Sequence, residues 1–513
     1  MNLRKIRIIL AAVFFIGITL LFLDFTGTLH HWLGWMAKVQ FLPAVLALNA
    51  IVIVLLVALT LIFGRIYCSV ICPLGVFQDI AAWLHKKRNR YTYSPAISWL
   101  RYAVLGIFIV ALVAGIGSLV ALLAPYSSYG RIATNLFQPI WMLGNNVLAA
   151  LAERVDSYAF YKTDVWLRTL PTFIIAAATF IILVVLAWRN GRTYCNTICP
   201  VGTVLGFLSR FSWFKIRFDA DKCRDCSLCS KNCKASCIDY KTHTVDYSRC
   251  VACGNCVDKC KFGALSYAPG KLTPNSKPQQ PTTKEDEEVS TNTQHPTSNT
   301  QETVSDASRR SFLLATALAT TAALAQEKKK VDGGLATIEE KVAPKRHTPI
   351  TPPGSLSAQH MAKHCTGCQL CVAECPNEVL RPATDLLHLM QPIMSYERGY
   401  CRPECTRCSE ICPTGALKPV AKEDKVSTKI GHAVWVKKNC LPIAEGIECG
   451  NCARHCPAGA IEMVPSDPDD ENSALIPAVD EEYCIGCGAC ENLCPARPFP
   501  AIYVEGHEQH STL

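Results

Sequence analysis

Cysteine is the residue type with the clearest chemical potential in this chain of 513 residues, because the chain holds 29 cysteines and most recur at fixed spacings. Residues 223–233 read CRDCSLCSKNC and residues 250–260 read CVACGNCVDKC, so both runs are C-x2-C-x2-C-x3-C. This spacing suits two [4Fe–4S] clusters, in which the fourth cysteine of each run ligates the other cluster. The predicted ligand sets are Cys223, Cys226, Cys229 and Cys260 for one cluster and Cys250, Cys253, Cys256 and Cys233 for the other.

Four further cysteine runs fill the C-terminal part of the chain, and each is followed by a proline. The second run has one extra residue in its first gap, and the third has a first gap of eight residues. Such insertions lengthen one loop without moving the other three cysteines. Four more clusters are therefore predicted, with the ligands Cys365, Cys368, Cys371, Cys375, Cys401, Cys405, Cys408, Cys412, Cys440, Cys449, Cys452, Cys456, Cys484, Cys487, Cys490 and Cys494.

The pairing of these four runs is left open by their spacing. A nested scheme pairs the first run with the fourth and the second with the third, whereas a sequential scheme pairs neighbours. We favour the nested scheme, because the two irregular runs then lie together. Zinc usually takes two C-x-x-C pairs rather than runs of four cysteines. Cys237 is a surplus thiol that could replace its neighbour Cys233 as a ligand, and the prediction keeps Cys233.

The first half of the chain contains four apolar segments long enough to cross a bilayer, which takes roughly 20 residues each. They lie near residues 6–23, 42–64, 99–124 and 169–189. Basic residues precede the first segment and follow the second and the fourth, and the other two connections hold fewer. The excess of basic residues on cytoplasmic loops then places the N-terminus and residues 190–260 in the cytoplasm.

The second and fourth apolar segments end in the same motif. Residues 64–75 read GRIYCSVICPLG and residues 191–202 read GRTYCNTICPVG, which indicates two repeated two-helix units. A C-x3-C spacing places both thiols on one helix face, and the proline that follows is expected to break the helix just past the second thiol. If the repeats pack as a pseudo-twofold pair, four thiols converge on one cofactor or metal site. The residues are Cys68, Cys72, Cys195 and Cys199, and the alternative is four reduced thiols that only pack at helix ends.

Several other kinds of chemistry are excluded by what the sequence lacks. No histidine lies within the apolar body of a span and no C-x-x-C-H occurs, so neither membrane haem nor covalently attached haem is expected. The net charge of +9 is modest and its basic groups are scattered, which argues against nucleic-acid binding. We find no catalytic triad and no phosphate-binding glycine loop, so no catalytic residue is assigned.

A second targeting feature lies in the middle of the chain. Residues 269–307 are rich in Pro, Thr, Ser, Asn and Gln, which is typical of a disordered linker. Residues 308–326 read SRRSFLLATALATTAALAQ, with two arginines, a short and mildly apolar run and a possible cleavage point at Ala325. This pattern favours a twin-arginine export signal or anchor, and the alternative is a surface helix. A domain that receives its clusters in the cytoplasm would have to be exported folded.

Residues 1–265, with paired C-x3-C-P motifs and a two-cluster module, resemble the NapH/MauN-type membrane ferredoxins. Residues 308–513, with the twin-arginine stretch and four cluster motifs, resemble the NapG/MauM-type ferredoxins. These two types are usually separate proteins, and here they are fused. The resemblance implies a quinol dehydrogenase module that takes electrons from the membrane quinol pool and passes them to a redox partner, a reductase or a cytochrome, on the outer side.

The sequence therefore predicts a multidomain fold: an α-helical membrane domain of four spans in two repeated units, and α+β bacterial ferredoxin-like modules. The expected boundaries are 1–212 for the membrane domain, 213–268 for the first module and 355–513 for the four-cluster domain. The expected function is electron transfer through six [4Fe–4S] clusters in the bacterial inner membrane, with the first module cytoplasmic and the C-terminal domain periplasmic. The alternatives are a cytoplasmic-facing electron wire, and a redox-sensing or maturation protein for a partner reductase.

Overall fold

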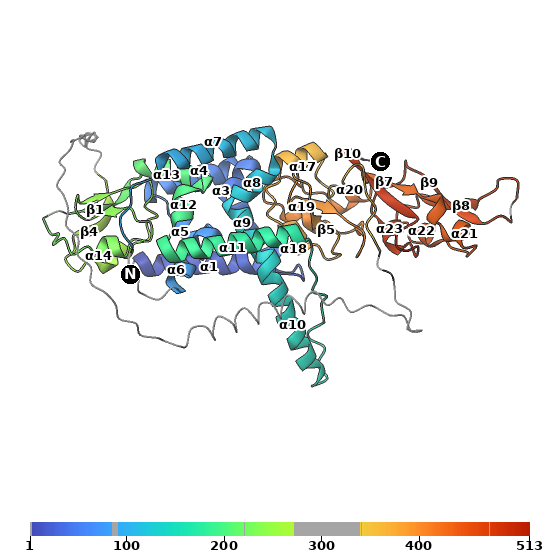
Figure 1. The fold of residues 1–513 in the computed structure, drawn as a ribbon, viewed down its shortest axis with the longest axis horizontal. Coiled ribbons are helices and arrows are strands. Elements are labelled where there is room, and N and C mark those ends of the chain that lie inside the picture. The colour runs from blue at the N-terminus through green and yellow to red at the C-terminus, as the bar shows by residue number, and fades with distance from the viewer. Residues whose placement is uncertain are drawn as a thin grey trace, which may run out of the picture. The chain divides into compact units, whose positions relative to one another are not determined.

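The computed structural model describes residues 3–84, 91–219, 221–270, 339, 341–470 and 472–512. Residues 1–270 and 340–513 form one compact unit, built from a helical domain, a small ferredoxin module and a C-terminal ferredoxin domain (Figure 1). The predicted signal at 308–326, and the predicted linker from residue 271 onwards, lie outside the described residues.

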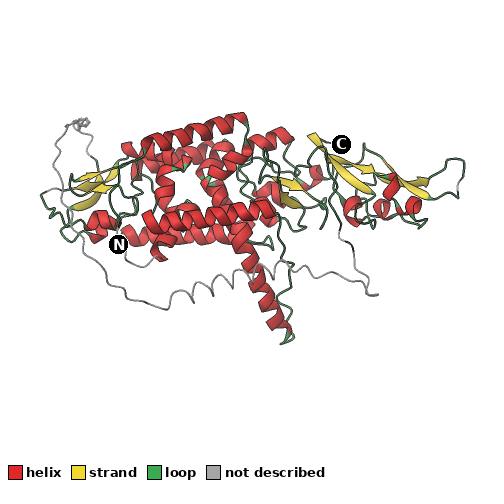
Figure 2. Ribbon diagram, in the orientation of Figure 1, coloured by secondary structure: helices red, strands yellow, loops and turns green. Residues whose placement is uncertain are grey.

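Helices make up the first domain, and their lengths correct the prediction of four uniform spans (Figure 2). Among the described helices, two are long and apolar enough to cross a membrane, α1 (Leu3–Leu23) and α11 (Leu170–Asn190). The other two predicted spans are interrupted. The second divides into α3 (Phe41–Leu46) and α4 (Ala50–Phe63), and the third divides into α7 (Ser98–Ala114) and α8 (Gly117–Leu123).

Both interruptions have local causes in the backbone. Leu48 has a positive φ of 53°, and the side chain of Asn49 accepts a hydrogen bond from Val52 N at 3.3 Å, which caps the start of α4. Gly115 ends α7 with φ 74° in the left-handed region, where glycine has no Cβ to clash. A hydropathy pattern reports apolar length, so it does not detect caps of this kind.

The remaining helices of this domain connect the apolar segments and build the repeats. They are α2 (His30–Lys38), α5 (Tyr67–Val70), α6 (Pro73–Leu84), α9 (Pro125–Ile132), a π-helix (Ala133–Phe137), α10 (Gln138–Glu153), α12 (Thr193–Thr197), α13 (Pro200–Leu208) and a 3-10 turn (Ser209–Phe211). The order α4–α5–α6 is repeated by α11–α12–α13, in agreement with the repeated motif in the sequence.

The small ferredoxin module follows with little secondary structure. Strand β1 (Phe214–Phe218) pairs antiparallel with β4 (Leu265–Pro269), and β2 (Ile238–Asp239) pairs antiparallel with β3 (Thr244–Val245). Two short helices, α14 (Leu228–Lys231) and α15 (Asn255–Lys259), carry the cysteine runs. The outer strands β1 and β4 of the module enclose residues 214–269.

The C-terminal domain repeats this plan with two-stranded sheets only. The antiparallel pairs are β5 (Leu380–Pro382) with β6 (Pro392–Met394), β7 (Thr428–Trp435) with β10 (Ile502–Thr512), and β8 (Ile461–Pro465) with β9 (Leu475–Val479). Its short helices are α17 (Ala358–His364), α18 (Leu370–Glu374), α19 (Arg407–Ile411), α20 (Lys422–Lys425), α21 (Leu441–Ala444), α22 (Asn451–Arg454) and α23 (Ala489–Leu493), with a 3-10 turn at Lys437–Asn439.

The small module contacts one end of the apolar helices. Tyr267 Oη donates to Phe63 O, at the last residue of α4, at 2.8 Å. Arg101, in the first turn of α7, donates to Ser248 Oγ at 3.1 Å. Arg192 N, just past α11, donates to Lys234 O at 2.8 Å. The module therefore meets the C-terminal ends of α4 and α11 and the N-terminal end of α7.

The C-terminal domain contacts the opposite ends of the same helices. Arg407 Nη1 donates to Thr26 O, three residues past α1, at 3.1 Å. Helix α17 packs against α8, which continues from the C-terminal end of α7. Asp164, ahead of α11, forms an ion pair with Arg398 at 3.6 Å. The two ferredoxin parts thus meet the helical domain at opposite helix ends.

Candidate metal centres

The small module gathers its cysteines into two pockets. One pocket is lined by Cys223, Cys226, Cys229 and Cys260, the first set expected from the spacing. The other is lined by five cysteines, namely Cys250, Cys253, Cys256, Cys233 and the surplus Cys237. The sulfur of Cys237 lies 3.5 Å from that of Cys233. Cys233 lies near Cys253 and Cys256, and Cys237 lies near Cys250, so both cysteines adjoin the set and Cys233 stays the predicted ligand.

The C-terminal domain pairs neighbouring runs, so the nested scheme is wrong. Cys494, the last cysteine of the fourth run, lines a pocket with Cys440, Cys449 and Cys452 of the third run. The reciprocal pocket is lined by Cys484, Cys487 and Cys490 of the fourth run together with Cys456 of the third.

The first two runs are related in the same way. Cys412 interacts electrostatically with Cys365, Cys368 and Cys371. Cys375 interacts in the same manner with Cys401, Cys405 and Cys408. The hairpins explain this result, because β5 and β6 join the first run to the second, and β8 and β9 join the third to the fourth.

The chemistry of these sets fits an iron–sulfur cluster. Backbone amides donate to ligand sulfurs, as Gly367 N does to Cys365 at 3.4 Å and Ala460 N does to Cys456 at 3.3 Å. Burial raises the pKa of Cys229, Cys401 and Cys452 to about 11. Four buried thiols become thiolates together only when a cation compensates their charge, which iron does. The residues present therefore suit [4Fe–4S] clusters.

The four sets of the C-terminal domain follow one another in space. Cys371 of the set completed by Cys412 interacts electrostatically with Cys408 of the next set. Cys401 N then donates to Cys487 O of a third set at 3.0 Å. The last pair of sets shares the third and fourth runs. Each set can be named by the one cysteine that it takes from the other run. Starting from the helical domain, the sets then follow in the order Cys412, Cys375, Cys456 and Cys494.

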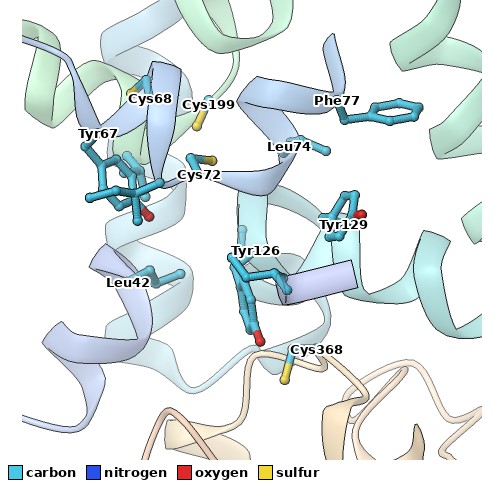
Figure 3. Packing of buried hydrophobic residues seen from close by; sticks show 14 of the residues in the cluster. Leu42, Tyr67, Cys68, Cys72, Leu74, Phe77, Tyr126, Tyr129, Cys199 and Cys368 are labelled. Atoms are coloured by element: carbon cyan, nitrogen blue, oxygen red, sulfur yellow. The ribbon is translucent and has the colours of Figure 1, made fainter. Parts of the chain in front are cut away.

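The cysteines of the repeated motif lie together between the two repeats (Figure 3). This cysteine quartet, Cys68, Cys72, Cys195 and Cys199, is buried, with each residue at most 5% exposed. The two thiols of a repeat do not share one helix, which corrects the sequence prediction. Pro73 and Pro200 begin α6 and α13, and Cys199 is the residue before α13, its sulfur accepting from Gly202 N at 3.3 Å. Proline suits the first turn of a helix because no N–H is needed there.

An arginine of each repeat donates a hydrogen bond to a backbone carbonyl of the other repeat. Arg192 Nη1 donates to Cys68 O at 2.6 Å, and Arg65 Nη2 donates to Cys195 O at 3.3 Å. A Cβ added at Gly75 would lie 2.2 Å from Cys68 O, and one added at Gly202 would lie 2.3 Å from Cys195 O. The motif therefore needs its glycine so that the next helix can approach this carbonyl, and it needs its arginine to bind the carbonyl from the opposite repeat.

Charge around the quartet favours an anionic occupant. Arg65 is fully buried and donates to Asn196 Oδ1 and Ser248 O, and within the described ranges it has no carboxylate partner. A buried arginine without a carboxylate requires another source of negative charge, and four thiolates around a cluster supply it.

Arg192 has a different partner, Asp79. Its Nε donates to Asp79 Oδ1 at 2.9 Å, while Arg7 from α1 and Lys234 from the small module lie at 3.3 and 3.6 Å from the same carboxylate. Burial alone would raise the pKa of Asp79, but these cations outweigh it and hold the pKa below its usual range. This network ties α1, both repeats and the small module together.

One apolar core joins the quartet to a cluster set on each side. Val251 and Cys253 of the small module pack in it, as does Cys368 of the C-terminal domain. Tyr126 lies between Cys72 and Cys368, with its hydroxyl end toward Cys368 (Figure 3). Arg131 interacts electrostatically with both Tyr194 and Cys368. The sequence analysis missed these residues, although the arginines of the quartet stand in the repeated motif itself.

Comparison with known proteins agrees with this division. Residues 45–91 and 171–219 match a 4Fe-4S binding domain, residues 243–266 match another 4Fe-4S binding domain, and residues 447–497 match a 4Fe-4S dicluster domain. The first match covers both cysteine motifs of the quartet. No solved structure matches the chain.

Curated relatives fall into two types. The methylamine utilization ferredoxin-type protein MauM of Methylobacillus flagellatus is 32% identical over 165 residues, which is 31% of this chain and 70% of MauM. MauN of the same organism is 26% identical over 209 residues, 40% of this chain and 62% of MauN. The ferredoxin-type protein NapH of Escherichia coli is 27% identical over 228 residues, 43% of this chain and 67% of NapH.

Proposed function

The chain belongs to the ferredoxin-type electron-transport proteins that include NapH, MauN and MauM, and from this premise we propose that it is a membrane-bound quinol dehydrogenase module serving a redox partner. The six ligand sets described above are proposed to hold six [4Fe–4S] clusters, which supply one-electron carriers. The protein itself fixes the order of these sets.

The observation that carries this proposal is the position of the two ferredoxin parts at opposite ends of the same helices. The small module binds Phe63 and Arg101, whereas the C-terminal domain binds Thr26 and packs against α8. If the apolar helices cross a bilayer, the two parts lie on opposite sides of it. An electron path from the membrane to an outer partner requires this arrangement.

We further propose that both interrupted segments cross the membrane with α1 and α11. Their breaks leave few backbone groups unpaired, since Asn49 N donates to Ala44 O at 3.0 Å and Ile116 N donates to Ala111 O at 2.9 Å. Both breaks lie where the helical domain meets α17 of the C-terminal domain, and satisfied backbone groups suit a position at the membrane boundary. The first module would then be cytoplasmic and the C-terminal domain periplasmic, exported by the twin-arginine-like stretch.

Exposed tryptophans support a membrane around these helices. Trp32 is exposed at the start of α2, beside His30, which lies 3.9 Å from Glu374 of the C-terminal domain. Trp83 and Trp99 are exposed on α6 and at the start of α7, at the other end. Tryptophan is enriched at both membrane–water interfaces, so exposed tryptophans near both ends of the helices fit a helical domain that crosses a bilayer.

The cysteine quartet is proposed as a seventh redox centre, holding a cluster or another soft metal. Four thiols, two buried arginines and a matching 4Fe-4S binding domain support this assignment. Its place in one core with Val251 and Cys368 favours a second function, a connection between a cytosolic electron donor and the outer sets. In that second function, electrons would pass through the quartet on their way across the membrane.

The proposed function is tested by anaerobic reduction of the cluster-loaded, full-length protein with a short-chain quinol analogue. We expect the visible absorption of the clusters to bleach and the electron paramagnetic resonance signals of reduced [4Fe–4S] clusters to appear. If dithionite reduces the protein but the quinol analogue does not, quinol oxidation is contradicted. The connection to a cytosolic electron donor then becomes the favoured function.

A further inference from the structure

A cavity of about 450 Å³ lies where the helical domain meets the C-terminal domain. The break between α3 and α4 forms one wall, with Leu46, Leu48 and Asn49. The other wall contains His360 and His364 of α17 and the predicted cluster ligand Cys412. Ligand cavities typically measure 300–1,000 Å³ and combine apolar walls with a few polar groups, so this one has the size and lining of a small-molecule site.

The mouth of the cavity adjoins surface suited to lipid. Leu48 is 83% exposed, and the first turns of α4 continue with Ile51, 81% exposed, and Val54, 66% exposed. Lys38, at the end of the tryptophan-bearing helix α2, also lines the cavity. In a bilayer, such a row of exposed aliphatic side chains faces acyl chains. A ligand with an apolar tail can therefore reach the cavity from the membrane.

Two histidines of α17 line the cavity and are held by backbone carbonyls. His360 Nε2 donates to Gly415 O at 3.0 Å, and His364 Nδ1 donates to His360 O at 3.0 Å. The rings stack with centroids 4.1 Å apart. The second nitrogen of a neutral imidazole carries no proton, so a ligand hydroxyl can donate to His360 Nδ1. Across the described residues this nitrogen has no other hydrogen-bond partner.

Building on the proposed quinol oxidation, we propose that this cavity binds the hydroquinone headgroup. A headgroup hydroxyl donates to His360 Nδ1, Leu46 and Leu48 contact the ring, and the isoprenoid tail leaves past Ile51. The ring then lies in the same cavity as Cys412, a ligand of the cluster set nearest the helical domain. His360 is the catalytic residue of this site, because it contacts the hydroxyl whose O–H bond breaks.

The reaction balances with the groups already named. Oxidation of one hydroquinone breaks two O–H bonds and yields one quinone, two protons and two electrons. Oxidised clusters held by the sets completed by Cys412 and Cys375 would accept one electron each, and the redox partner would reoxidise them. Both protons leave to water at the outer face, and the hydrogen bond to His360 Nδ1 begins that route.

Two substitutions in the full-length, cluster-loaded protein test the site. His360→Phe keeps a ring against His364 and removes the acceptor, and Leu48→Trp fills the cavity from an exposed position. We expect quinol-driven cluster reduction to slow on the order of 100-fold in His360→Phe. We also expect Leu48→Trp to abolish photolabelling of the α17 peptide by an azido-quinone analogue. The control His507→Phe alters a comparable stacked pair, His432 and His507, on β7 and β10, and should change neither readout.

Each outcome decides between the site and the broader function. Loss of labelling and of quinol reduction, with unchanged dithionite-reduced spectra, supports the cavity as the quinol site. Quinol reduction and labelling that persist in both variants place the quinol elsewhere and overturn this inference alone. Leu48→Trp protein that loses a co-purified phospholipid while it still binds the analogue shows a lipid site instead. A wild-type protein that quinol never reduces overturns the proposed function itself.

Discussion

The six cluster-ligand sets and the cysteine quartet are all groups of four thiols, but the chain assembles them in different ways. In each ferredoxin set, three cysteines come from one run and the fourth from the paired run, so a bound cluster would join two separate segments of the chain. The quartet draws two thiols from each of two helical repeats that already share a large apolar core. A metal would therefore add a link between segments in the first case, whereas helix packing prepares the site in the second.

This contrast predicts that iron removal has its largest effect on the C-terminal domain. Its sheets are all two-stranded and its core is lined by cysteines, so cluster binding contributes on the order of 10 kcal/mol to folding, as structural metal sites do. Protein purified from iron-limited cells should lose protease resistance after residue 355 and keep the helical signal of α1 and α11. A C-terminal domain that is equally resistant with and without iron would remove the distinction.

The second prediction concerns electron flow through the quartet. The double substitution Cys68→Ser and Cys72→Ser should leave all six ferredoxin clusters in the spectrum, because none of their ligands is changed. Transfer from a reduced cytosolic donor to the C-terminal sets should fall close to zero, since the quartet lies between them. The measurement is freeze-quenched electron paramagnetic resonance. Unchanged transfer in the double variant would make the quartet a structural element only.

A third prediction tests whether packing shapes the quartet. Gly75→Ala and Gly202→Ala each bring a Cβ onto a backbone carbonyl that an arginine holds, and overpacking of this kind costs about 1–3 kcal/mol. Gly144→Ala on α10 is the matched control, because its Cβ meets nothing within 4 Å. Thermal unfolding in detergent should show a lower Tm for the first two variants and an equal or higher Tm for the control. Equal behaviour of all three would argue against a tightly packed site.

The smallest effect is expected at Cys237. Its sulfur lies beside Cys233, but the C-x2-C-x2-C-x3-C spacing assigns the ligand position to Cys233, so Cys237→Ser should leave the iron content unchanged. Cys233→Ser is the paired control and should lose one cluster. Iron and sulfide analysis of both variants distinguishes them, and the opposite result would exchange the roles of the two cysteines.

Local spacing explains which parts of this molecule could be predicted from its sequence. A run such as Cys484, Cys487 and Cys490 encodes its own loop, so three ligands of each set follow from the sequence alone. Which run supplies the fourth ligand depends on which hairpin forms. The nested pairing, which we predicted from the two irregular gaps, was therefore wrong. The hairpins β5–β6 and β8–β9 bring neighbouring runs together.

Long-range contacts explain what the sequence did not reveal. The repeated motif indicated two repeats, but the exchange of arginines between them requires Arg65 and Arg192 to reach carbonyls 130 and 124 residues away. The helix breaks at Leu48 and Gly115 come from the positive φ angle of a single residue. A hydropathy pattern averages apolar character over many residues and does not detect such a conformation. The cavity at His360 forms between parts of the chain more than 300 residues apart, so no local pattern marks it.

The central claim is that the two ferredoxin parts lie on opposite sides of the membrane. It is tested most directly by protease protection of a tag placed after Leu513, compared with a tag in the loop at residue 221, in spheroplasts and in inverted vesicles. We predict that the C-terminal tag is digested only in spheroplasts and the loop tag only in inverted vesicles. Digestion of both tags in inverted vesicles alone would place every cluster in the cytoplasm and contradict a relay to an outer partner.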